Sequence, residues 1–231
     1  VEDQHSLFRE NMAKFKHLLL RGHISGMDIT GSIVEGSKKY IDLEEKAETV
    51  LFERFQIIYD TLSNPEAPGQ LKIHMYESTP EGEFYDIFFS SLKDQLAKKG
   101  SGSIPPIIRI GHINALRTQD IQRFKDFDTI KDRFVFEANI DSNVNLKKTT
   151  PTKLAATVNE LVASGFKVRL GTDGLGIFGN IALFDSTIDR LKTGGLSDKA
   201  LMHIRSESDL PIYKNKNYNQ FGKKLQCLYF Y

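Results

Sequence analysis

Short apolar runs alternate along the chain with longer segments that have helical spacing. The short runs are each about the length of a buried strand, and they cover residues 23–30, 71–76, 106–112, 133–140 and 167–173. The longer, amphipathic segments cover residues 7–22, 42–62, 83–100 and 150–166. Strands that are separated by helices, and that do not alternate strictly, predict an α/β fold with a mainly parallel sheet and helices outside it.

One of the amphipathic segments carries clear signals for both of its ends. Thr150 is followed by Pro151, which suits an N-cap residue and a proline in the first turn of a helix. Gly165 closes the same segment, as glycine commonly does at a helix C-terminus. The pattern therefore predicts a helix between these residues, after the fourth apolar run.

Polar residues occur where each of the five apolar runs ends. They are Asp28, His74, His112, Asn139 and Asp173. In a βα barrel, the carboxyl ends of the strands are where catalytic groups gather. Five such ends in succession, rich in His and Asp, predict a functional site at that edge of the sheet.

Composition and charge exclude several classes of function. The chain has 31 Lys plus Arg and 30 Asp plus Glu, so its net charge of +1 indicates no nucleic-acid or membrane partner. Cys227 is the only cysteine, which excludes an intrachain disulfide and a cysteine-rich zinc site. No segment approaches 18 consecutive apolar residues, and the first ten residues do not resemble a signal peptide. We therefore expect a cytoplasmic protein.

The polar residues at the strand ends suggest metal chemistry when they are taken together. Singly, His74 is most simply a polar group at a surface, Glu77 a solvated acid, and Asp173 a turn residue before Gly174. Together, imidazole and carboxylate groups are ligands that suit zinc or another divalent metal. A metal activates water for attack, and an acid such as Glu77 could protonate the group under attack. The set predicts metal-assisted hydrolysis.

Five stretches of the chain, in order, resemble motifs of the adenosine/AMP deaminase family, a branch of the amidohydrolase superfamily. The resemblance covers roughly residues 7–190. "GMDITG" (26–31) is similar to G-F-D-L-A-G, "IHMYE" (73–77) to V-H-A-G-E, and "RIGHINAL" (109–116) to R-I/L-G-H-G-x-x-L. "FEANIDSNVNL" (136–146) resembles L-E-x-C-P-x-S-N-x-x-L, and "VRLGTDGLGIFG" (168–179) resembles V-x-L-x-T-D-D-P-x-I-F.

The resemblance implies a fold and a reaction. The fold is a (β/α)8 TIM barrel of the metallo-dependent hydrolase type, of which this chain holds strands four to eight in residues 1–205. Residues 206–231 would form a C-terminal tail or extension. The reaction is hydrolytic deamination at C6 of an adenine-containing purine nucleoside or nucleotide, giving an inosine-type product and ammonia.

The resemblance also implies roles for particular residues, with Zn²⁺ or another divalent metal as cofactor. His74 and Asp173 would bind the metal, Glu77 would give a proton to N1 of the purine, and His112 would orient the attacking water. Around the substrate, the backbone of Gly31 would approach the purine edge, with Asp28 and Gly174 as further substrate-binding positions.

Three departures from the family pattern leave alternatives open. The family takes two metal ligands from an H-x-H motif, but no two of the six histidines are two residues apart. Strands one to three have no counterpart, so we expect them to come from another segment or another chain. Gly174 stands where the family has a second Asp that contacts the five-membered ring.

Two further hypotheses compete with deamination, and only the first of them rests on these departures. The chain could be a binding or assembly module that has lost catalysis, or another amidohydrolase that acts on an amide or a different amine. A homo-oligomer is also compatible with the sequence. The basic, aromatic tail after residue 205 would suit contact with a partner chain.

Overall fold

The computed structural model describes residues 2–29, 46–76, 83–98, 104–140, 144, 149–171, 183–209 and 228–229. All five predicted strands are present as β1 to β5, and a further short strand, β6, follows near the C-terminus. The strands are β1 (Gly26–Ile29), β2 (Gln70–Ile73), β3 (Ile107–Ile110), β4 (Phe134–Ala138), β5 (Lys167–Leu170) and β6 (Leu228–Tyr229). The predicted α/β class is thus confirmed.

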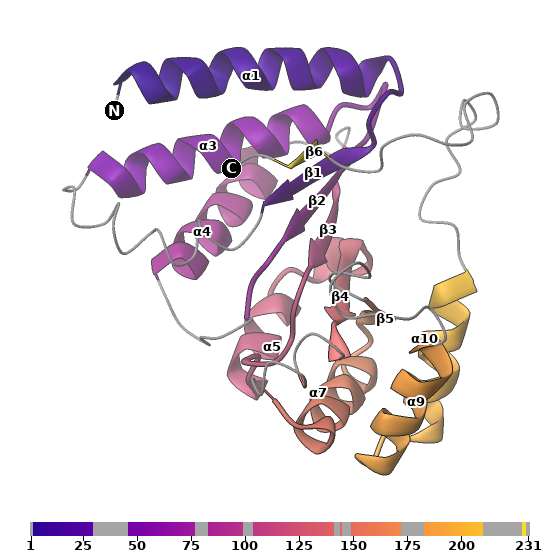
Figure 1. Cartoon of the computed structure of the whole chain (residues 1–231). Helices are drawn as coiled ribbons and strands as arrows, with labels where there is room; N and C mark the ends of the chain where they lie inside the picture. The colour runs from indigo at the N-terminus through magenta and orange to yellow at the C-terminus, as the bar shows by residue number, and fades with distance from the viewer. Residues whose placement is uncertain are drawn as a thin grey trace. The chain divides into compact units, whose positions relative to one another are not determined.

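Helices separate the strands along the chain (Figure 1). They are α1 (Glu2–Leu20), α3 (Lys46–Leu62), α4 (Glu83–Lys98), α5 (Thr118–Lys125), the 3-10 helix η1 (Asp128–Arg133), α7 (Pro151–Ala163), α9 (Leu183–Thr193) and α10 (Asp198–Asp209). The four helices expected from amphipathic spacing correspond to α1, α3, α4 and α7. Helices α5, η1, α9 and α10 were not assigned from the sequence. None of the described helices is long and apolar enough to cross a membrane.

The strands are hydrogen-bonded in the order β5-β4-β3-β2-β1-β6. Strand β1 runs parallel to β2 and to β6, and β4 runs parallel to β5. Helices therefore connect strands that run in one direction, as the sequence predicted. The structure shows the parallel sheet, and its closure into a (β/α)8 barrel stays a prediction.

The chain divides into two compact units. The first contains residues 1–73, 81–108 and 214–231, and the second contains residues 74–80 and 109–213. Strand β3 is shared, with Ile107 and Ile108 in the first unit and Arg109 and Ile110 in the second.

The first unit places α1 and α4 against α3 and pairs β1 with β2. Gly26 lies opposite Gln70 in this pairing, and a Cβ atom at Gly26 would collide with the Gln70 backbone oxygen. The close approach of the two strands therefore requires glycine here. Met27 and Ile73 are apolar and buried. The alternate positions hold Asp28, which is also buried, and Lys72, which is half-buried.

The second unit has an aromatic core. The ring of Phe124 in α5 makes edge-on contacts with Phe134, Phe136 and Phe166, at centroid separations of 5.1, 5.0 and 6.4 Å. Successive side chains of a strand point to opposite faces, so Phe134 and Phe136 on one face of β4 leave Glu137 on the other. Helix α5 therefore covers the face of β4 that carries the phenylalanines, and Glu137 lies on the opposite face.

The ends of α7 follow the sequence signals. Lys153 N–H donates to the Thr150 hydroxyl at 3.2 Å, so Thr150 is the N-cap. Pro151 occupies the first turn. Beyond the helix, Gly165 has a φ of 80°, a left-handed conformation that glycine adopts without a steric penalty.

Candidate active site

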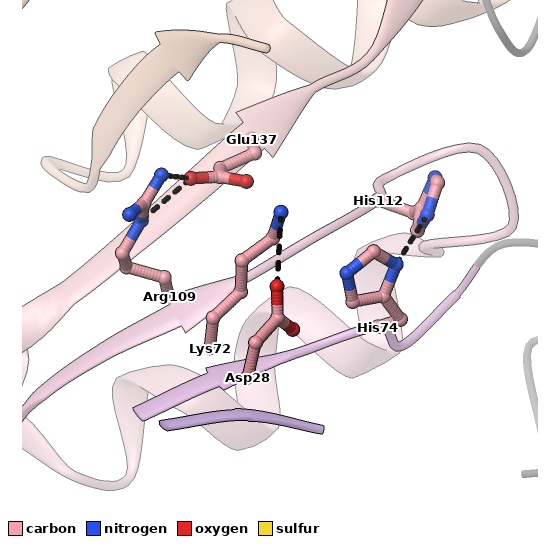
Figure 2. Close-up of polar contacts among 6 residues, drawn as sticks. All are labelled: Asp28, Lys72, His74, Arg109, His112 and Glu137. Atoms are coloured by element: carbon pink, nitrogen blue, oxygen red, sulfur yellow. Dashed lines mark hydrogen bonds and ion pairs between the residues drawn. The ribbon is translucent and has the colours of Figure 1, made fainter. Parts of the chain in front are cut away.

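The second unit brings His74 and His112 together. His74 directly follows β2, and His112 comes two residues after β3. His74 Nδ1 lies 3.1 Å from His112 Nε2, and the ring centroids are 5.0 Å apart (Figure 2). His112 is fully buried and His74 is half-buried. Two residues that are 38 positions apart in the sequence therefore form one hydrogen-bonded pair.

A second link joins the segments that carry these histidines. Ala115 N–H donates to the Tyr76 carbonyl oxygen at 2.9 Å, and the Tyr76 ring packs edge-on against Phe124 at 6.3 Å. Because Tyr76 is fully buried, the chain after β2 is anchored both by its backbone and by its side chain. The position of His74 next to His112 is therefore built into the packing of this unit.

Tyr76 has an unusual backbone conformation. Its φ is 58°, in the left-handed region that bulky residues rarely adopt, at a cost of roughly 1–2 kcal/mol. Tyr76 stands where the motif V-H-A-G-E has its glycine. The backbone here takes the conformation that glycine would adopt freely.

Arg109 in β3 and Glu137 in β4 form an ion pair in the second unit. Arg109 Nε donates to Glu137 Oε1 at 2.6 Å, and its Nη2 contacts the same oxygen (Figure 2). The Glu137 side chain is 4% exposed and that of Arg109 is 19% exposed. Arg169 lies opposite Glu137 in the β4–β5 register. The sequence analysis assigned no role to this pair. Each residue is a charged position inside an apolar run, and that pattern could have indicated a buried ion pair.

Asp28 lies within β1, not beyond its end. Its carboxylate forms an ion pair with Lys72 at 3.7 Å, and the two residues are register partners on neighbouring strands of the first unit (Figure 2). Asp28 is 4% exposed. The pair gives this buried carboxylate a countercharge; the substrate-binding role of Asp28 stays a prediction.

Four predicted site residues lie outside the described residues: Gly31, Glu77, Asp173 and Gly174. Within the described part, no group of three or more His, Cys, Asp or Glu residues is arranged to hold a metal ion. In donor chemistry, the imidazole of His74 suits zinc or another divalent metal, as does the carboxylate of Asp173. The contact with His112 engages Nδ1 of His74, so Nε2 is the ring atom that would bind a metal. Such orientation by a hydrogen bond at the other ring nitrogen is usual for metal-binding histidines.

Asn139 and Gly171 directly follow β4 and β5 in the second unit. Asn139 is 1% exposed, and Gly171 N–H donates to the Ala138 carbonyl oxygen at 3.1 Å. A Cβ atom at Gly171 would collide with Asn139 Oδ1. The sequence marked Asn139 as a polar strand end, but it did not indicate its burial against a glycine.

We compared the chain with protein-family models, with curated proteins and with solved structures, and none of the three comparisons found a match. The function is therefore inferred from the geometry of the described residues and from the sequence motifs.

Proposed function

We propose that this chain forms part of a metal-dependent deaminase that hydrolyses an adenine-containing purine nucleoside or nucleotide. In this proposal, β1 to β5 are strands four to eight of a (β/α)8 barrel, and the remaining strands come from another segment or chain. The observation that carries the proposal is the contact of 3.1 Å between His74 and His112. These are the histidines of the two motifs that the family would place beside one metal centre.

The histidine pair suits the roles that the motifs imply. At this separation one ring nitrogen donates a hydrogen and the other accepts it, which holds both rings in a fixed orientation. His74 would hold the metal together with Asp173, and His112 would hold the attacking water. When bound, a divalent metal would lower the pKa of its water to about 7 and so supply hydroxide at neutral pH.

The remaining chemistry belongs to the chain and the substrate. The water oxygen forms a bond to C6 of the purine, and the bond between C6 and the exocyclic nitrogen breaks. Glu77 gives a proton to N1. Of the two protons of the water, one completes the departing ammonia and the other returns Glu77 to its protonated form. Removal of such a general acid typically lowers the rate by about 10²–10⁴-fold.

The conformation of Tyr76 gives independent support. Its φ of 58° occurs at the glycine position of the V-H-A-G-E motif, between the expected metal ligand and the expected proton donor. Strained residues of this kind cluster at functional sites.

The test is a spectrophotometric assay of the intact protein with adenosine, AMP and ATP, together with metal analysis. We expect deamination of at least one of these compounds and close to one metal per site. The variant His74→Ala should lose metal and turnover, whereas Glu77→Gln should keep the metal and lose most turnover. His17→Ala is the matched control, because His17 is an exposed histidine in α1 of the first unit. If His74→Ala and Asp173→Ala both leave deamination intact, the site assignment is wrong.

A binding or assembly module is the second candidate, because the chain contains no H-x-H pair. Metal content separates the two. Less than about 0.2 metal per site at neutral pH would exclude this catalytic mechanism, since a catalytic zinc site needs its metal bound. The module would then be the better hypothesis.

A further inference from the structure

The side chain of Asn139 is buried and makes no hydrogen bond within the described part of the chain. It is 1% exposed, and neither Nδ2 nor Oδ1 has a hydrogen-bond partner among the described residues. Buried carboxamides are normally satisfied, and an unsatisfied one is costly. A costly group of this kind at the carboxyl end of a strand points to a ligand contact.

Gly171 keeps space open for this carboxamide. Oδ1 of Asn139 occupies the volume that a Cβ atom at Gly171 would need. The reason for glycine is this contact, because Gly171 is not among the glycines with positive φ. Any side chain at residue 171 would push the carboxamide of Asn139 away from the end of β5.

We propose that Asn139 binds the purine by donating a hydrogen bond from Nδ2 to N7. This inference rests on the proposed function and names the part of the base that Asn139 recognises. Gly174 has no side chain to contact the five-membered ring, although the motif it resembles has Asp there. Asn139 supplies a substitute from the neighbouring strand.

The chemistry of the two side chains explains why asparagine suits this contact. N7 of a purine is a hydrogen-bond acceptor. An ionised aspartate only accepts hydrogen bonds, so it can bind N7 only after taking up a proton. The asparagine amide donates without any change of protonation. Asparagine contacts to the N6 and N7 positions of adenine are a common mode of base recognition.

The test compares adenosine with 7-deazaadenosine, in which a C–H group replaces N7. We expect wild-type kcat/KM to be about tenfold lower for the deaza compound, the scale of one lost hydrogen bond. Asn139→Ala should lower kcat/KM for adenosine by a similar factor and treat the two nucleosides alike. Gly171→Ala should do the same, because its new methyl group would clash with the Asn139 carboxamide and would make only an ordinary contact with Glu137. Asn64→Ala, in the loop after α3, is the matched control and should keep the tenfold preference.

Product binding gives a readout that does not need turnover. Calorimetry with inosine and 7-deazainosine should show the same preference in the wild type and its loss in both variants. Circular dichroism and thermal melting check that each variant is folded. If Asn139→Ala does not fold, Asn139→Asp replaces it in the comparison. The Asn139→Asp variant should bind inosine more weakly as the pH rises, because only the protonated carboxyl group donates a hydrogen bond.

The outcomes separate this inference from the proposed function. Turnover of adenosine with no preference over the deaza compound overturns the N7 contact, and so does a preference that survives in both variants. Preferential binding of inosine without any turnover supports the contact and overturns the deamination. If the intact protein binds neither product and deaminates neither adenosine nor an adenine nucleotide, both proposals are wrong.

Discussion

The ion pair between Arg109 and Glu137 allows a sharp prediction about stability. The Arg109→Met substitution keeps an unbranched side chain but removes the cation from a carboxylate that is 4% exposed. Removing one partner of a buried pair typically costs about 3–5 kcal/mol, because the remaining charge stays buried without compensation. Arg169 lies opposite Glu137 in the β4–β5 register and keeps one positive charge nearby. We therefore expect the lower end of this range, about 3 kcal/mol.

The same argument predicts a different result when both partners are replaced. A buried ion pair that is exchanged for apolar residues of similar volume is often neutral in stability. The double variant Arg109→Met/Glu137→Leu should therefore lie within about 1 kcal/mol of the wild type. Glu137→Leu alone should cost less than Arg109→Met, because the Arg109 side chain is 19% exposed and reaches water. The coupling energy of the double-mutant cycle should exceed about 2 kcal/mol.

Equilibrium unfolding in urea, followed by far-ultraviolet circular dichroism, measures these free energies. In a thermal scan, 3 kcal/mol corresponds to a fall in Tm of roughly 6–12 °C for a domain of this size. Arg133→Met is the matched control. Arg133 pairs with the exposed Asp132 at 3.8 Å, and a surface pair of this kind contributes at most about 1 kcal/mol. The reasoning is refuted if Arg109→Met costs no more than the control, or if the two single changes add without coupling.

Three further predictions concern stability and use the same unfolding assay. Gly194→Ala should destabilise the second unit by about 1–3 kcal/mol, since its Cβ atom would lie 2.5 Å from the Pro151 carbonyl oxygen; an unchanged stability would contradict the close-approach argument. Thr150→Ala should cost about 1 kcal/mol through loss of the α7 cap, and Thr150→Ser should restore it; a Ser variant as unstable as the Ala variant would show that the cap contributes nothing. Tyr76→Gly and Tyr76→Ala both lose the buried ring. The glycine variant should nevertheless be more stable than the alanine variant by roughly 1 kcal/mol, because only glycine adopts a φ of 58° without strain. The reverse order would mean that the backbone relaxes out of this conformation.

Much of the second unit was predictable from local sequence. The run 133–140 contains β4, and the signals at Thr150 and Gly165 bracket α7 correctly, because caps and turns depend on residues a few positions apart. Helix α5 was missed because it is only eight residues long and strongly polar apart from its buried Ile121 and Phe124. A stripe of two apolar residues is too short to establish a helical period.

The candidate site was predictable in part. The types of residue at the strand ends pointed to His74 and His112, and the motifs placed them at one centre. The contact between Nδ1 and Nε2, however, depends on how the segments after β2 and β3 lie against each other. The Ala115–Tyr76 hydrogen bond and the packing of Tyr76 on Phe124 set that arrangement. None of these contacts has a periodic signal, because each joins segments far apart along the chain.

The sequence by itself determined the order and type of the main elements, since hydrophobic periodicity reflects whether one face or both faces of an element are buried. It also identified His74, His112 and Asn139 as polar groups that follow strands. Only the tertiary structure decided which residues meet: His74 with His112, Arg109 with Glu137, and Asn139 with Gly171. The physical reason is that each pair is formed across neighbouring strands or the segments that follow them. Parallel strands are joined by long crossover connections, so residues that become neighbours on adjacent strands lie far apart along the chain and are not indicated by the local sequence.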